Sequence, residues 1–200
     1  STVRWIARTF GTTTQGRLPI IADLIVVAYF FLLRVCEYTK SRRATRTVPL
    51  RRQDIQLWNG GAILLHTAPL ADLLQATSAT INLENQKNGV RGSAVHHESS
   101  GDPNIDPVRS LARLVHHIAS LPPSTPLGTF NAANGRLMQV SPSDIAAMLK
   151  GGAIGDNLIS AGYDIARIGT HSLRSGGAIN LAINGIDHAI IMKIGRWSSN

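Results

Sequence analysis

The sequence predicts an α+β domain that is mainly helical and carries a small antiparallel β-sheet built from hairpins. Apolar residues recur at helical spacing around residues 19–39, 106–119 and 170–183. Between the first two of these segments, residues 54–65 and 78–97 alternate apolar and polar side chains on either side of Asn-Gly turns, the pattern of β-hairpins. With 200 residues, 44% of them hydrophobic, we expect one domain with its own core.

The composition favours a polyanionic partner inside the cell. Twenty Lys and Arg against twelve Asp and Glu give a net charge of +8 and a pI near 10.6. The single cysteine, Cys36, excludes an intramolecular disulfide framework, fits a reducing compartment and is expected in the core. Residues 20–33 are the most apolar run, but Asp23 interrupts it and it is shorter than the roughly 20 residues of a membrane span. No membrane partner is expected.

The first segments lead into a long central helix. Residues 1–17 predict a lead-in segment or a short helix followed by a loop, and Pro19 suits the first turn of a helix running to about Thr39. Arg34 follows fourteen nearly uninterrupted apolar residues of this helix, and burying an unpaired guanidinium is costly. Glu37, three residues later, can pair with it. The spacing leaves open whether Arg34 is only an ion-pair partner or also binds an anion.

A basic stretch follows this helix. Its basic residues are Lys40, Arg42, Arg43, Arg46, Arg51 and Arg52. Such a run is often a solvated surface, but it is equally suited to contact the phosphate backbone of DNA. We therefore name its five arginines as candidate DNA-binding residues and keep both interpretations.

The second hairpin places Lys87 at its tip, immediately before the Asn88-Gly89 turn. A lysine there is by default a solvated residue that improves solubility. The histidine pairs at 96–97 and 116–117 do not predict a metal site, because adjacent side chains point apart on a strand or a helix and cysteine ligands are lacking. We expect neither a metal nor another cofactor.

Further helices are expected in the second half of the chain. One covers residues 106–119, and a capping box from Ser141 to Asp144 precedes another over residues 145–150, after which glycines interrupt the pattern. A further helix is expected over residues 156–162.

Residues 170–183 form the most informative helix. Thr170 can serve as its N-cap, and His171 and Arg174 then point the same way in its first turns. An imidazole and a guanidinium fork at the positive end of a helix suit a phosphate oxygen. The alternative is that His171 caps the helix or fills a core position and that Arg174 makes a salt bridge. Asp187 caps a short final helix that ends at Gly195.

Taken in chain order, these motifs resemble the active-site signature of tyrosine recombinases, the phage-integrase family, from about Leu18 to the end. The matching elements are Leu33-Arg34-x-x-Glu37, the hairpin lysine Lys87, His171-x-x-Arg174 and Gly195-Arg196-Trp197. The resemblance implies a recombinase catalytic-domain fold. It also implies that Arg34 and Arg174 hold the scissile phosphate, Glu37 steadies Arg34, Lys87 protonates the departing 5′-oxygen, and His171 donates a hydrogen bond or accepts a proton.

The tail departs from the family pattern in two ways. Many members place a histidine directly after the glycine. Counted from Gly195, Arg196 occupies that position, whereas Trp197 matches by residue type. We favour Trp197 and keep Arg196 as a supporting residue. The family's tyrosine nucleophile has no match either, because none of Tyr29, Tyr38 and Tyr163 follows the histidine motif. We therefore expect a piece of a longer protein whose tyrosine lies beyond residue 200, so that this piece binds DNA without cutting it.

The resemblance also implies partners. They are double-stranded DNA and further copies of the protein, which would assemble on DNA as a synaptic tetramer. The resemblance also implies an intracellular location, in the nucleus if the source is eukaryotic. Arg196-Trp197 and the hairpin sequence are more similar to recombinases of eukaryotic mobile elements than to bacterial resolvases. Three alternatives stay open: an inactive or domesticated DNA-binding module of the same fold, a type IB topoisomerase, and a basic protein-interaction domain with a coincidental His-x-x-Arg.

Overall fold

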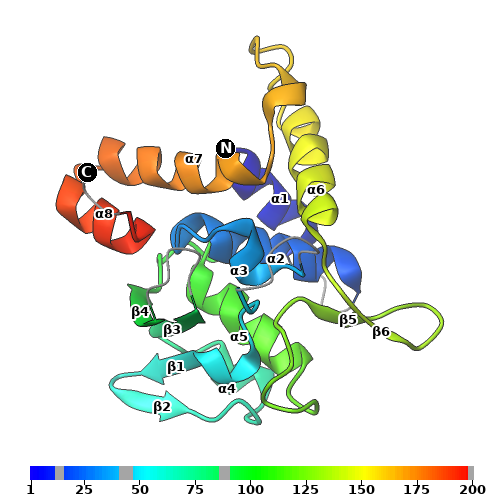
Figure 1. Cartoon of the computed structure of the whole chain (residues 1–200), viewed down its shortest axis with the longest axis vertical. Helices are drawn as coiled ribbons and strands as arrows, with labels where there is room; N and C mark the ends of the chain where they lie inside the picture. The colour runs from blue at the N-terminus through cyan, green and yellow to red at the C-terminus, as the bar shows by residue number, and fades with distance from the viewer. Residues whose placement is uncertain (12–15, 41–46, 86–90, 198–200) are drawn as a thin grey trace.

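The computed structural model describes residues 1–11, 16–40, 47–85 and 91–197 and has an α+β architecture (Figure 1). The helices are α1 (Thr2–Phe10), α2 (Arg17–Phe30), α3 (Val35–Tyr38), α4 (Leu70–Leu73), α5 (Pro107–His117), α6 (Pro142–Gly155), α7 (Thr170–Ile183) and α8 (His188–Gly195), with 3-10 turns η1 (Arg52–Asp54) and η2 (Ile165–Arg167). The strands are β1 (Ile55–Asn59), β2 (Ala62–Leu64), β3 (Ser78–Asn85), β4 (Arg91–Glu98), β5 (Thr129–Asn131) and β6 (Leu137–Gln139). The predicted class, mainly helical with a small antiparallel sheet, is confirmed.

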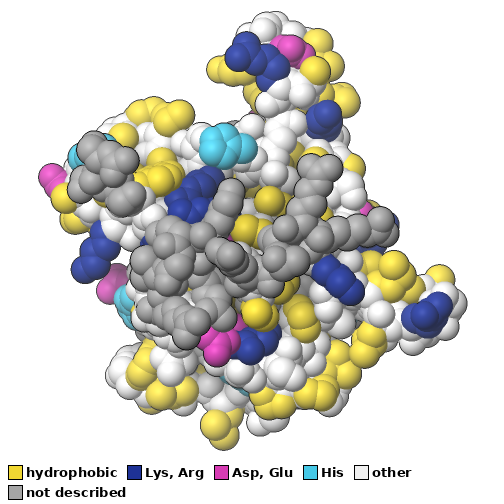
Figure 2. Space-filling model, in the orientation of Figure 1, with side chains coloured by type: hydrophobic (Ala, Val, Ile, Leu, Met, Phe, Trp, Pro, Cys, Tyr) yellow, Lys and Arg dark blue, Asp and Glu magenta, His cyan; other side chains and the backbone are white. Residues whose placement is uncertain are grey.

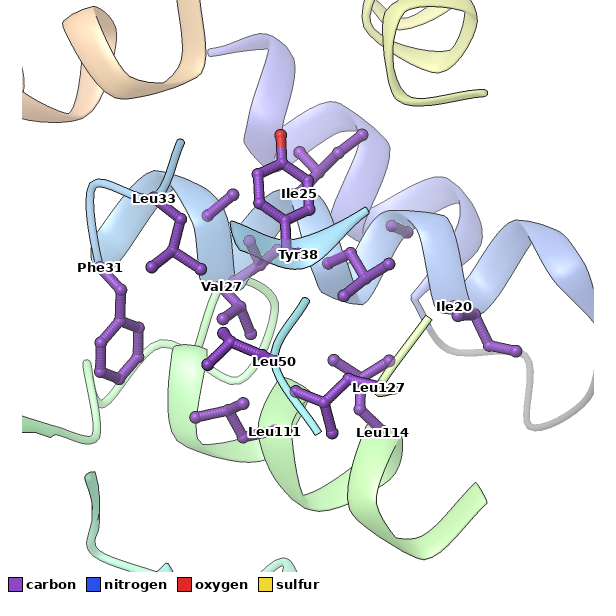
Figure 3. Close-up of a cluster of buried hydrophobic side chains, with 14 of the residues drawn as sticks. Ile20, Ile25, Val27, Phe31, Leu33, Tyr38, Leu50, Leu111, Leu114 and Leu127 are labelled. Atoms are coloured by element: carbon purple, nitrogen blue, oxygen red, sulfur yellow. The ribbon is translucent and has the colours of Figure 1, made fainter. Parts of the chain in front are cut away.

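Helix α2 forms the centre of the core. Every residue from Pro19 to Ala28 is buried, and the helix packs against α1, α5, α6 and α7. Figure 3 shows Val27 of α2 in the same apolar cluster as Leu111 of α5. The buried carboxylate of Asp23 accepts a hydrogen bond from Nε of Arg113 on α5, at 2.9 Å from Oδ2, so the charge inside this apolar helix is paired.

Helix α2 ends well before the predicted limit, and the end is unusual. Leu32 has a left-handed backbone with φ of 49°, and the N–H of Leu33 bonds to the carbonyl of Ala28 at 3.0 Å. Glycine normally occupies such a position, and a side chain there costs about 1–2 kcal/mol. The Leu32 side chain is fully buried, which offsets this cost. The chain then turns, and Arg34 becomes the N-cap of α3 instead of lying inside a helix.

The first four strands form one antiparallel sheet in the order β2-β1-β3-β4. Both predicted hairpins are present: β1 pairs with β2, and β3 pairs with β4 with Ile81 opposite Val95. Strand β1 joins the hairpins by placing Ile55 opposite Ile81. Helix α5, which begins where the sequence predicts and has Asp106 as its N-cap, packs against the strands.

Helix α6 continues through Gly151 and Gly152, where the sequence predicts an interruption, and ends at Gly155. A Cβ at Gly152 would lie 2.5 Å from Cγ1 of Ile6, and one at Gly155 would lie 2.2 Å from the Trp5 ring. The glycines therefore allow α1 to pack closely against α6, and of the two alternatives for the first segment the short helix is present, as Thr2–Phe10. The helix predicted over residues 156–162 is wrong, because that segment forms turns.

Helix α7 packs against α2, and α8 packs against α7 (Figure 1). Gly169, not Thr170, is the N-cap of α7, and its N–H donates to Oγ of Ser172 at 3.1 Å. The predicted cap of α8 is confirmed, since Oδ1 of Asp187 accepts from the N–H of Ala189 at 2.8 Å. No helix within the described ranges is long and apolar enough to cross a bilayer.

Candidate functional site

A hollow of about 330 Å³ lies where the start of α7 meets the link between α2 and α3. Its lining residues are Leu33, Arg34, Val35, Cys36, Thr170, His171, Arg174 and Trp197. Four of the predicted site residues thus come together from three distant parts of the sequence. Figure 2 shows Lys or Arg side chains next to a histidine on this face, below α7.

Arg174 is buried, at 5% exposed, and its contacts fix the guanidinium in place. Its Nη1 donates to the carbonyl of Leu32 at 3.0 Å, and its Nη2 donates to the carbonyl of Gly195. Its guanidinium carbon lies 4.5 Å from the centre of the Trp197 ring, a cation–π contact. Neutral carbonyls and a ring fix the fork without cancelling its charge. No carboxylate in the described part of the chain pairs with Arg174, so the salt-bridge alternative is not what the structure contains.

Arg34 and Arg196 share one buried carboxylate. Glu37 has a side chain that is 1% exposed and accepts from the backbone N–H of Arg34 at 2.7 Å, from Nη1 of Arg34 at 3.2 Å and from Nη2 of Arg196 at 2.7 Å. Arg34 therefore pairs with Glu37 and also lines the hollow, and its binding of an anion there stays a prediction.

Positive charge exceeds negative charge around the hollow. Burial, followed by the nearby charges of Arg34 and Arg196, lowers the pKa of Arg174 to about 10. Burial likewise lowers the pKa of Arg196, although Glu37 opposes this shift. Among the described residues, three guanidinium groups lie near one carboxylate, that of Glu37, so the net charge of this group is positive. A phosphate would supply the missing charge and accept hydrogen bonds from a fork such as that of Arg34.

His171 is exposed in the first turn of α7 and lines the hollow. The alternative that His171 caps the helix or fills a core position is therefore wrong. Thr170 and His171 line the hollow together, so the N-terminus of α7 places the positive end of its dipole there. The imidazole is thus positioned to meet a ligand that enters from solvent.

The structure distinguishes the two candidates in the tail. Trp197 lines the hollow, and its ring packs so closely on Gly195 that a Cβ there would lie 2.2 Å from Cε3 of the ring. Arg196 has a left-handed backbone with φ of 54°, and its side chain points inward to Glu37. Trp197 is therefore the residue that reaches the hollow.

Some predicted residues fall outside the described residues. These are Lys87, Arg42, Arg43 and Arg46. The described pairing of β3 with β4 extends to Asn85 opposite Arg91, on either side of the segment that contains Lys87. The roles of these four residues stay predictions.

Arg51 and Arg52 are engaged within the fold. Nε of Arg51 donates to Oδ2 of Asp54 at 3.0 Å, and its Nη2 also reaches Glu84; the bond to Asp54 raises the pKa of Arg51. Arg52 is 8% exposed and donates from Nη2 to the carbonyl of Leu121 at 2.8 Å. Neither lines the hollow. The prediction that they contact a DNA backbone gains no support from this geometry.

None of the three tyrosines lines the hollow. Tyr38 is 2% exposed, and burial raises its pKa; burial also raises the pKa of half-buried Tyr29. Tyr163 is 62% exposed and lies in the turns before η2. Among the described residues, no three His, Cys, Asp or Glu side chains gather closely enough to hold a metal ion.

Sequence reasoning missed the backbone acceptors of the site. The carbonyls of Leu32 and Gly195 orient Arg174, and no residue type marks either carbonyl in the sequence. Cys36, expected in the core, is instead partly exposed in the wall of the hollow. The early end of α2 accounts for the Leu32 carbonyl and for Cys36, because residues 34–36 leave the helix and are partly exposed.

Comparison with known proteins supports the fold. No protein-family model matches the chain, and no curated protein matches it by sequence. Among solved structures, the chain is similar to FLP recombinase in its complex with a Holliday junction, with a TM-score of 0.53 and 14% sequence identity. The similarity covers 99% of this chain and 43% of that chain, so this chain spans less than half of the recombinase. The chain therefore has a recombinase-like fold.

Proposed function

We propose that this domain binds double-stranded DNA and is the catalytic domain of a tyrosine-type site-specific recombinase or integrase. The observation that carries the proposal is the convergence of Arg34, His171, Arg174 and Trp197 on one cationic hollow. The recombinase-like fold supports it. The hollow gives a phosphodiester two guanidinium forks, a helix N-terminus and an imidazole, which are the groups that stabilise charge on a phosphorus centre.

The proposed step is a transesterification. A tyrosine oxygen attacks phosphorus, the bond to the 5′-oxygen breaks, and a 3′-phosphotyrosyl bond forms, so the number of phosphoester bonds is conserved and no cofactor is required. Arg34 and Arg174 bind the non-bridging oxygens, and His171 donates a hydrogen bond or accepts the tyrosine proton. Lys87 gives a proton to the 5′-oxygen. Trp197 orients Arg174 and packs against the phosphate.

The nucleophile is proposed to lie beyond residue 200, because none of the three tyrosines present lines the hollow. The same observation favours a second candidate function. A protein with this hollow and no tyrosine near it would be a DNA-binding module of recombinase fold. Self-association on DNA as a synaptic tetramer belongs to the first proposal only.

Incubation of the full-length protein with a nicked suicide duplex tests the proposal. We expect a covalent protein–DNA complex that resists denaturant, and we expect Arg34→Ala and Arg174→Ala to abolish it with little loss of DNA binding. Arg136→Ala is the matched control, because Arg136 is an exposed arginine in the β5–β6 hairpin. DNA binding without a covalent complex would establish the binding module instead, and cleavage that survives both substitutions would exclude the proposed roles.

A further inference from the structure

Arg196 is a buried arginine that does not line the hollow. Its side chain is 6% exposed, and its left-handed backbone ends α8. An arginine is an expensive residue to bury, so its contacts must compensate for lost hydration. The sequence predicts Arg196 only as a supporting residue and does not indicate which groups its side chain contacts.

The Arg196 fork bridges α8 to the break between α2 and α3. Its Nη1 lies 3.0 Å from the carbonyl of Ile194 and 3.4 Å from that of Phe31. Its Nη2 lies 3.3 Å from the carbonyl of Leu32 and 2.7 Å from Oε2 of Glu37. One side chain thus connects three backbone carbonyls and a carboxylate.

Two of these acceptors also orient the arginines of the hollow. The Leu32 carbonyl accepts from Nη1 of Arg174 at 3.0 Å, and the Glu37 carboxylate accepts from Nη1 of Arg34 at 3.2 Å. Arg196 therefore shares one acceptor with each guanidinium that faces the ligand. Moving Arg196 would release both acceptors together.

We propose that Arg196 is a positioning residue that fixes the Arg34 and Arg174 forks through the Leu32 carbonyl and the Glu37 carboxylate. The inference rests on the proposed function, since it concerns the same phosphate-binding hollow. Arg196 also raises the local positive charge while remaining out of reach of the ligand, so the phosphate meets Arg34 and Arg174 and not Arg196.

The positioning role requires a guanidinium, because its N–H donors diverge in one plane and can reach several acceptors at once. A lysine at this position would keep the charge and could keep the pair with Glu37, but a single ammonium nitrogen cannot span the separated carbonyls of Phe31 and Leu32. Arg196→Lys is therefore the informative variant. Arg196→Met removes the charge as well, and both replacements are unbranched at Cβ, so neither adds the strain of β-branching to the left-handed backbone. Arg136→Met is the matched control for loss of one charge, since Arg136 lies in the distant β5–β6 hairpin (Figure 1).

The test measures side-chain order and anion binding in the chain itself. The first readout is the exchange rate of the Nε–H groups of Arg34 and Arg174 by NMR. The second is the dissociation constant for inorganic phosphate. In both Arg196→Lys and Arg196→Met we expect Nε–H exchange to accelerate about tenfold and the phosphate dissociation constant to rise about tenfold, the change of about 1.4 kcal/mol that loss of one hydrogen bond from Arg196 to the shared acceptors would give. Arg136→Met should change neither.

The outcomes separate this inference from the proposed function. If Arg196→Met fails to fold, Arg196→Lys decides, because it retains the pair with Glu37. Wild-type exchange rates and phosphate affinity in Arg196→Lys would overturn the positioning role. Arg174→Ala tests the hollow: unchanged phosphate affinity in that variant would refute the proposed function, whereas faster Nε–H exchange in Arg196→Lys would still support the positioning role.

Discussion

Gly177 determines how closely α7 approaches α2, and its replacement by alanine has a calculable effect. A Cβ at Gly177 would lie 2.3 Å from the carbonyl oxygen of Tyr29 and 2.6 Å from Cδ2 of Leu32. Real Cβ contacts are at least 3.0 Å, so α7 would have to move away by about 0.7 Å. The obstacle is a backbone atom that cannot rotate aside. Overpacking of this kind costs about 1–3 kcal/mol.

The neighbouring glycine provides the matched control. A Cβ at Gly176 would lie 3.7 Å from Cε2 of Tyr29, an ordinary contact. Gly176→Ala and Gly177→Ala gain the same helix propensity, about 1 kcal/mol, so the difference between them isolates the overpacking. At 2–4 °C per kcal/mol for a domain of this size, Gly177→Ala should melt about 2–12 °C below Gly176→Ala.

Thermal unfolding followed by circular dichroism measures this difference, and a phosphate titration measures its effect on the hollow. Because Arg174 lies on the displaced helix, Gly177→Ala should also weaken phosphate binding, whereas Gly176→Ala should not. Equal melting temperatures for the two variants would show that α7 does not approach α2 as closely as described, and the placement of Arg174 would then be wrong.

Three further predictions follow from other contacts. Asp23→Ala leaves the partly buried Arg113 without its carboxylate and should lower the free energy of unfolding by about 3 kcal/mol in urea titration; a change under about 1 kcal/mol would contradict the pairing. Gly195→Ala places a Cβ inside the Trp197 ring, so the ring should leave Arg174; unchanged fluorescence and phosphate affinity would count against this packing. Burial lowers the pKa of His97, so on acidification through pH 6.5 the unfolded chain binds a proton that the folded chain does not, and stability falls. His97→Gln should therefore reduce the slope of unfolding free energy against pH between 5 and 7, and an unaltered slope would refute the shift.

The sequence was sufficient wherever side-chain pattern determines local structure. The hairpins follow from alternating residues and tight turns, and α5 begins where the sequence predicts because Asp106 accepts from the N–H groups of Val108 and Arg109. The order of the arginine and histidine motifs also led to the residues that line the hollow.

The remaining features depend on tertiary contacts that no local pattern contains. The end of α2 could not be predicted, because the apolar pattern continues past it and Leu32 adopts a left-handed conformation that is usually marked by a glycine in the sequence. The glycines of α6 suggested a break, but Gly152 is present because Ile6 packs there from a distant segment. For Arg51 and Arg52 the charge pattern left open a solvated surface or a contact with DNA, and it could not indicate that Asp54 and a backbone carbonyl engage them within the fold.

The most direct measurement of the central claim is a phosphate titration that follows the Nε–H signals of Arg34 and Arg174 by NMR. Since both guanidinium groups line one hollow, their signals should shift together and give the same dissociation constant, with the exposed Arg136 as an unaffected internal reference. Signals that shift with different dissociation constants, or an effect no larger than that on Arg136, would show that the two arginines do not share an anion.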